Sequence, residues 1–284
     1  NGKTISKKNC QDDVIKKSKL ESEFSRNVLI LMSGSAIAQL IPIIATPFIT
    51  RLFSPQEIGI YGYVIVLIVL LSVLVTLRYE QAMVLANNEK ELIALKNLSL
   101  ISTIFFSIIF SLVLFLIDFI YFDSSYILFV IAIFLILFLS GVINTLISFF
   151  NYKKNYTIIS KSVAYTSIAN TSSNLVLGYF VGGSIVLVMS LLVSKFLSLI
   201  ITVRGAKNEF IRWTSRLKLI YVAKKFSDMP KFSAPEALIG GLNTQANFIF
   251  IGLYDIKIAG AYFIVNRLLG TPISVFSTSF SKVF

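Results

Sequence analysis

The sequence lacks histidine, has one cysteine, and has only 14 acidic residues against 26 basic ones. Without histidine there is no imidazole base, no Ser–His–Asp triad and no histidine metal ligand. The single Cys10 cannot form a disulfide within the chain. There is also no G-x-x-x-x-G-K-[ST] phosphate loop and no Cys/His spacing of a metal site. We therefore expect no cofactor and no metal. Because the loops that could present catalytic side chains are also short, we expect a protein that is not an enzyme, with no catalytic residues.

What the chain has in abundance is apolar residues. Of its 284 residues 56% are hydrophobic, and the mean hydropathy is +0.81. Soluble domains are nearer 45–50% apolar, so the composition predicts an integral membrane protein. The net charge of +12 could indicate nucleic acid. Because the cations cluster in connections on one side of a membrane, membrane topology explains them better, and we expect no nucleic-acid partner.

Eight apolar segments are long enough to cross a bilayer. They are Val28–Thr50, Gly59–Leu77, Asn97–Ile117, Tyr126–Phe150, Thr157–Phe180, Ser184–Val203, Phe232–Leu253 and Ile258–Phe280. The predicted fold class is all-α integral membrane protein with about eight transmembrane helices. We expect a basic tail over 1–26, a first six-helix bundle over 27–203, a basic amphipathic linker over 204–231, and the start of a second bundle over 232–284.

The charges of the connections predict the orientation. Basic residues are concentrated in the N-terminal tail and in the connections between the second and third, the fourth and fifth, and the sixth and seventh segments. The loops on the opposite side contain only two basic residues, Arg51 and Lys257. The positive-inside rule therefore predicts a cytoplasmic N-terminus. Within the linker, apolar residues at helical spacing lie among cations: Trp213, Leu217, Ile220 and Tyr221. The pattern fits a helix on the anionic cytoplasmic leaflet or a plain connection between two bundles, and we favour the connection.

A weak repeat with an offset of 201 residues supports a second bundle. Leu52, Gly59, Tyr61, Val64 and Leu67 match Leu253, Gly260, Tyr262, Val265 and Leu268. Both stretches cover a loop and the following helix of a hairpin that begins on the same side, which is typical of a parallel repeat. If the repeat unit has six helices, the second copy stops after two, so about four spans are missing. We accordingly expect a C-terminally truncated or fragmentary chain, and its first residue, Asn1, is not a methionine.

Two cations, Lys195 and Arg267, lie about 10 residues inside apolar segments, or roughly 15 Å from their ends. A cation near the bilayer centre costs about 2.5 kcal/mol or more unless it meets a cavity, a counter-charge or an anionic ligand. The chain offers few acidic residues at that depth, so contact with an anionic substrate is one hypothesis. The alternative is a cation that reaches water or a backbone carbonyl.

Polar stripes add further candidates. Gln39 belongs to a stripe on the first segment, and Asn243 and Asn247 belong to one on the seventh. Such stripes line hydrated cavities or simply pack against other helices. We favour a cavity for the first, seventh and eighth segments, because amides and charges exceed what packing requires. Arg78 ends the second segment, where it either pairs with an acid such as Glu80 or reaches the interface alone.

Four stretches carry a resemblance to a known family: QLIP at 39–42 with RLFSPQEIGIY at 51–61, LRYEQAMVL at 77–85, MPKFSAP at 229–235, and GAY at 260–262 with RLLGTPI at 267–273. They resemble the polysaccharide-export flippases, which move lipid-linked oligosaccharides for O-antigen and capsule synthesis. The likeness runs over most of Ser25–Phe284. That family is similar in fold to multidrug-extrusion transporters, with two six-helix bundles, and the expected count of twelve or more spans exceeds the eight found here.

The resemblance implies translocation of undecaprenyl-pyrophosphate-linked repeat units across the bacterial inner membrane, through a cationic central cavity. It implies substrate contact for Arg267 and also for Lys195, Arg51 and Arg78, while the amides Asn243, Asn247 and Gln39 bind sugar hydroxyls. Membrane lipids, a polysaccharide polymerase and a chain-length regulator are the expected partners. Two alternatives remain: a cation-coupled multidrug exporter, which needs a buried carboxylate, and a membrane glycosyltransferase or polymerase, which needs larger outer loops.

Overall fold

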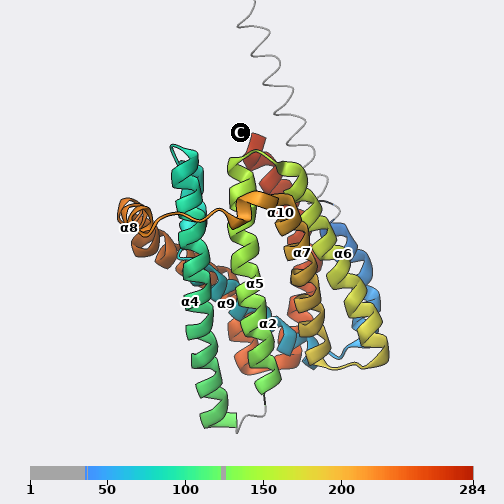
Figure 1. Cartoon of the computed structure of the whole chain (residues 1–284). Coiled ribbons are helices and arrows are strands. Elements are labelled where there is room, and N and C mark those ends of the chain that lie inside the picture. Colours follow the sequence, from blue (N-terminus) through green and yellow to red (C-terminus); the bar gives the residue numbers. More distant parts are fainter. Residues whose placement is uncertain (1–35, 37, 123–125, 284) are drawn as a thin grey trace, which may run out of the picture.

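The computed structural model describes residues 36, 38–122 and 126–283, and all elements within these ranges are helical (Figure 1). They are a first helix Ala38–Leu52, α2 Pro55–Val75, α3 Tyr79–Ala82, the 3-10 turn η1 Met83–Leu85, α4 Glu89–Phe122, α5 Ile127–Tyr152, α6 Tyr156–Phe180, α7 Ser184–Ile211, α8 Arg216–Lys225, the π-helical turn η2 Met229–Ser233, α9 Ala234–Tyr254 and α10 Ile256–Val283. The predicted all-α class is confirmed. The predicted basic tail, 1–26, lies outside the described residues.

Four of the described helices combine the length and the apolar composition needed to cross a membrane. They are Pro55–Val75, Glu89–Ile120, Ile127–Tyr152 and Ser184–Ala206. The helices α6, α9 and α10 have 25, 21 and 28 residues, which is long enough for a bilayer, but they carry more polar side chains. The described part of the first helix, Ala38–Leu52, is apolar and shorter.

Two helices extend well beyond their predicted bounds: α7 ends at Ile211 rather than Val203, and α4 starts at Glu89 rather than Asn97. The side-chain oxygen of Asn88 accepts a hydrogen bond from the Glu91 amide at 2.9 Å, and the Glu91 carboxylate accepts one from the Asn87 amide at 3.1 Å. These bonds cap the free amides of the first turn, and acidic residues there favour the helix dipole. Lys96 therefore lies inside α4 instead of in the preceding connection.

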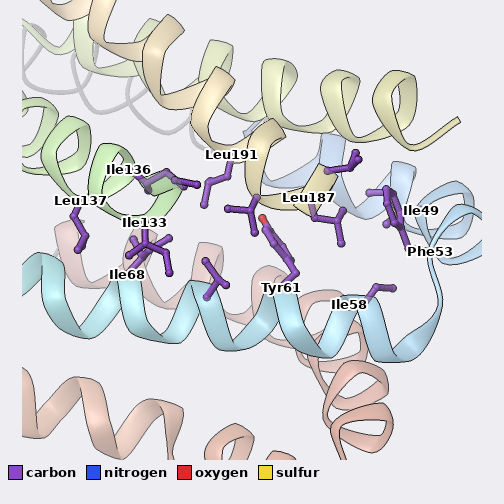
Figure 2. Close-up of a cluster of buried hydrophobic side chains, with 14 of the residues drawn as sticks. Ile49, Phe53, Ile58, Tyr61, Ile68, Ile133, Ile136, Leu137, Leu187 and Leu191 are labelled. Atoms are coloured by element: carbon purple, nitrogen blue, oxygen red, sulfur yellow. The ribbon is translucent and has the colours of Figure 1, made fainter. Parts of the chain in front are cut away.

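A first unit packs around α2, α5 and α7. The helix α6 runs along α7, α4 runs along α5, and α5 also packs on α7. Figure 2 shows apolar side chains of the first helix, α2, α5 and α7 converging, among them Ile49, Tyr61, Ile136 and Leu187. In a bilayer this convergence stabilises by close packing, because lipid tails are as apolar as the side chains.

A second unit, α9 and α10, packs on α2. Phe248 of α9 and Ala259 of α10 are buried against Val66, and the Phe248 ring meets the Phe263 ring edge-on at 6.0 Å. The loops 53–54 and 255 lie at one end of these helices, here named the short-loop end. The linker and α8 lie toward the opposite end, here named the linker end (Figure 1).

Candidate functional site

A small cavity lies where α10 meets the first unit. Helices of both units line it: Thr46, Ile49 and Thr50 of the first helix, Ile58 and Tyr61 of α2, Asn174 of α6, Leu187 of α7, and Phe263, Ile264 and Arg267 of α10. Its volume is about 20 Å³, which is room for about one water molecule. We call it the Arg267 cavity.

Helix periodicity explains how Arg267 reaches this cavity. Phe263 and Ile264 precede Arg267 by four and three residues, so the three side chains share one face of α10. The Phe263 ring meets the Tyr61 ring edge-on, with centroids 5.9 Å apart and planes at 82°. Tyr61 is buried, and its hydroxyl lies near both Arg267 and Asn170 of α6. The aromatic contact thus fixes the face of α10 that carries the guanidinium.

The helix α6 brings polar atoms toward the same region. Asn174 is 1% exposed, and within the described part of the chain its side-chain oxygen has no hydrogen-bond partner. The same holds for the side-chain oxygens of Asn170 and Thr171. An unsatisfied buried polar group costs about 1–3 kcal/mol, so these atoms favour a water molecule or a polar ligand beside them. Asn174 reaches the cavity wall itself.

Of the seven residues predicted from sequence for the substrate site, Arg267 alone lines this cavity. Lys195 follows the start of α7 by 11 residues, as Arg267 follows the start of α10, which places both about 16 Å along their helices. Lys195 is half-buried on α7 but lines neither the Arg267 cavity nor the groove described next. The two cations are similar in depth along the helices and differ in surroundings.

Arg51 and Gln39 lie at other places on the first helix. Arg51 is exposed and lines an open apolar groove of about 590 Å³ against α6, together with Phe48, Leu52, Leu175, Val176, Tyr179 and Phe180. Gln39 is half-buried, and its side-chain oxygen has no hydrogen-bond partner among the described residues. Nearby, the Ser167 hydroxyl donates to the carbonyl of Ala38, which ties the first helix to α6.

Arg78 lies at the linker end, in a break between α2 and α3. Leu77 and Arg78 have φ angles of 50° and 61°, a left-handed conformation that turns the chain sharply. With the Gln81 amide oriented to accept, its oxygen receives hydrogen bonds from the Arg78 guanidinium at 2.9 and 3.1 Å. Arg78 also lies close enough to Glu80 for their charges to attract. The guanidinium hydrogen bonds thus go to Gln81, while Glu80 attracts Arg78 through charge alone.

Burial gives Glu80 an unusual environment. Its side chain is 8% exposed, and one carboxylate oxygen has no hydrogen-bond partner in the described structure. Burial raises the pKa of the Glu80 carboxyl above its usual range, while Thr76 and Arg78 oppose that shift less strongly. The residue lies on the short helix α3, between the spans.

The polar stripe of α9 faces outward. Asn243 and Asn247 are both exposed, as are Gly240 and Thr244 on the same face. None of them lines the Arg267 cavity. The predicted amide contribution to this cavity therefore comes from Asn174 of α6 and not from α9.

Sequence reasoning missed two further residues. Tyr61 appeared only as a member of the repeat, yet it forms part of the cavity wall. Lys96 was assigned to a loop, yet it is 0% exposed and donates a hydrogen bond to the Arg212 carbonyl at 3.0 Å. The Asn-x-x-Glu spacing at 88–91 is a helix-start signal that would have placed Lys96 correctly.

These features define a multi-pass, all-helical membrane protein with Arg267 between two packed units. The fold is similar to that of a solved multidrug resistance transporter of the MATE family, in the MOP superfamily, captured outward-facing. That match has a TM-score of 0.54 and 12% identity, covering 92% of this chain and 67% of the other. The model of the family described as "Polysaccharide biosynthesis protein" matches residues 24–284, and the chain belongs to this family. No curated protein matches the sequence significantly.

Proposed function

We propose that this protein moves undecaprenyl-pyrophosphate-linked oligosaccharide repeat units across the bacterial inner membrane, with its N-terminus in the cytoplasm. The observation that carries the proposal is the position of Arg267, whose side chain lines a cavity between the two units next to the Tyr61–Phe263 ring contact. A guanidinium matches the oxygens of a phosphate in charge and geometry. Membership of the polysaccharide biosynthesis family supports a glycan cargo.

The small size of the Arg267 cavity means that the two units must move apart before a substrate can bind there. A space of about 20 Å³ holds about one water and excludes a pyrophosphate. Substrate contact with Arg267 therefore needs α10 to separate from the first helix and α6. Relative movement of two units around a fixed site is the usual basis of alternating access. In this proposal residues 27–203 form the first bundle, 204–231 the linker, and 232–284 the beginning of the second bundle.

Sugar recognition and assembly complete the proposal. Asn174 and Asn170 offer amides beside Arg267, and Arg51 offers a cation at the short-loop end. Lys195, Arg78, Gln39, Asn243 and Asn247 line other parts of the path in an opened state. A polymerase and a chain-length regulator receive the translocated units.

The test deletes the gene in its native host and measures lipid-linked repeat units on each face of the inner membrane. We expect units to accumulate on the cytoplasmic face and surface polysaccharide to be lost. The gene should restore both, whereas an Arg267→Ala allele with normal membrane insertion should not. Units that reach the outer face without polymerising would indicate a polymerase instead. Unchanged polysaccharide would favour the multidrug exporter, and the proposal would be wrong.

A further inference from the structure

The helix α8 docks on α4 at the linker end (Figure 1). The Lys225 ammonium forms a salt bridge with the Glu91 carboxylate at 2.6 Å, and the buried Lys96 ammonium donates to the Arg212 carbonyl just before α8. Val222 and Phe226 are buried in the same apolar cluster as Leu92 and Leu95 of α4. One face of α8 is thus fixed to the first unit by charge and packing together.

The contacts place α8 at a definite level along α4. Its partners on α4, from Glu91 to Lys96, come directly before a stretch without charged residues, 97–117. Such a transition from charged to apolar residues marks the border of the hydrocarbon core. The helix α8 therefore lies beside the headgroup layer rather than in bulk solvent.

The opposite face of this helix is apolar and uncovered, and so is Trp213 in the connection before it. Trp213 is 63% exposed and Leu217 is 82% exposed, with Ile220 and Tyr221 similarly open. Within α8 the spacing of three and four residues from Leu217 puts Ile220 and Tyr221 on the same side as Leu217, whereas Val222 and Phe226 lie on the other side. Trp213 precedes α8 in the connection that leads into it. A helix that only connects two bundles needs one apolar face, and α8 has two.

Charge identifies what covers the second face. The segment 210–227 contains five cations and no carboxylate. Lys225 is engaged with Glu91, and the other four, Arg212, Arg216, Lys218 and Lys224, are exposed. Exposed apolar and aromatic side chains among cations, on a short helix and in the connection just before it, are typical of an interfacial segment that binds anionic lipid.

We infer that the outward face of α8, together with Trp213, is a binding surface for anionic phospholipid headgroups in the leaflet at the linker end. The apolar side chains enter the boundary between headgroups and acyl chains, while Arg216, Lys218 and Lys224 contact phosphate oxygens. This surface is separate from the Arg267 cavity and does not depend on the translocated substrate. Because its other face is fixed on α4, α8 attaches the first unit to the leaflet next to the connection that leads to η2 and α9.

Trp213 is the single tryptophan of the sequence and so reports on this surface directly. The 284-residue chain is reconstituted into phosphatidylcholine bilayers that contain an equal mole fraction of brominated phosphatidylglycerol or brominated phosphatidylcholine. Bromine quenches tryptophan on contact. We expect the anionic lipid to quench Trp213 with an apparent affinity about fivefold or more above that of the zwitterionic lipid.

Two variants make the result specific. Replacing Arg216, Lys218 and Lys224 together by glutamine should abolish the preference for the anionic lipid, whereas Lys257→Gln, an exposed cation at the short-loop end, should leave it unchanged. Equal quenching by both lipids would overturn the inference, because the surface would then have no charge selectivity. Absence of quenching by either lipid would also overturn it, since the face would then lie in water or against a protein partner.

Discussion

Gly59 and Gly260 meet where α2 crosses α10, and each faces the backbone of the other helix. A Cβ atom on Gly59 would overlap the Ile256 carbonyl, and one on Gly260 would overlap the Pro55 carbonyl. Gly59 and Gly260 are 201 residues apart, and so are Pro55 and Ile256. This separation is the offset of the sequence repeat. The crossing is therefore nearly symmetric, as expected for parallel repeats related by a two-fold axis along the membrane normal.

Close approach of these backbones makes Gly260 sensitive to the smallest substitution. We expect Gly260→Ala to lower stability by about 1–3 kcal/mol, because the added methyl group forces the helices apart. Gly240→Ala on α9 is the matched control, since nothing lies within 4 Å of its Cβ position. Thermal unfolding in detergent, followed by loss of the monodisperse species, compares the two. Equal melting temperatures would contradict the close crossing.

The buried carboxyl of Glu80 predicts a pH dependence. Because burial raises its pKa in the folded state, the folded chain holds this proton more tightly than the unfolded chain. The contribution to stability is thus full below the ordinary glutamate pKa and is lost as pH rises through the raised value. We expect Glu80→Gln to be more stable than the parent at neutral pH and to remove that part of the pH profile. Glu89→Gln, at an exposed site, should keep the parental profile.

The buried amide oxygen of Asn174, which has no hydrogen-bond partner among the described residues, predicts a separation of stability from transport. Leucine has a similar shape and no polar atom to leave unsatisfied, so Asn174→Leu should unfold at the same temperature or higher. The proposed sugar contact would be lost, so repeat-unit export should fall. Export assays and melting curves on the same preparation measure both. A variant that transports normally would show that Asn174 serves packing alone.

The length of the apolar segments predicted the helices. In lipid the backbone groups must be hydrogen-bonded within the protein, so each membrane-spanning helix appears in the sequence as one long apolar segment. The bounds of α6 and α7 at the short-loop end, Phe180 and Ser184, were predicted to the residue. The start of α4 was missed because charge was weighed above the cap at Asn88. The same error explains why the sequence did not predict the burial of Lys96.

The partners of a polar residue were harder to predict. A lone arginine in an apolar run identifies Arg267, since its cost in lipid must be offset somewhere. Periodicity also found the polar stripes on the first helix and α9, but it does not say which polar residues meet another helix. Asn174 is buried and Asn243 exposed because α6 packs along α7, whereas this face of α9 turns away from α2. Only tertiary packing distinguishes them.

The different surroundings of Arg267 and Lys195 predict different outcomes for equivalent substitutions. Arg267→Ala removes the cation that lines the cavity among the described residues, and loss of a charge-assisted bond to phosphate should reduce export about tenfold or more. Arg267→Lys keeps the charge but not the planar fork, so we expect an intermediate rate. Lys195→Ala should reduce export less than Arg267→Ala. Export is measured as the rate at which repeat units reach the outer face, normalised to the inserted protein. Equal losses in the two alanine variants would mean that Lys195 joins the path when α10 moves, and normal export in both would exclude a cationic site at this depth.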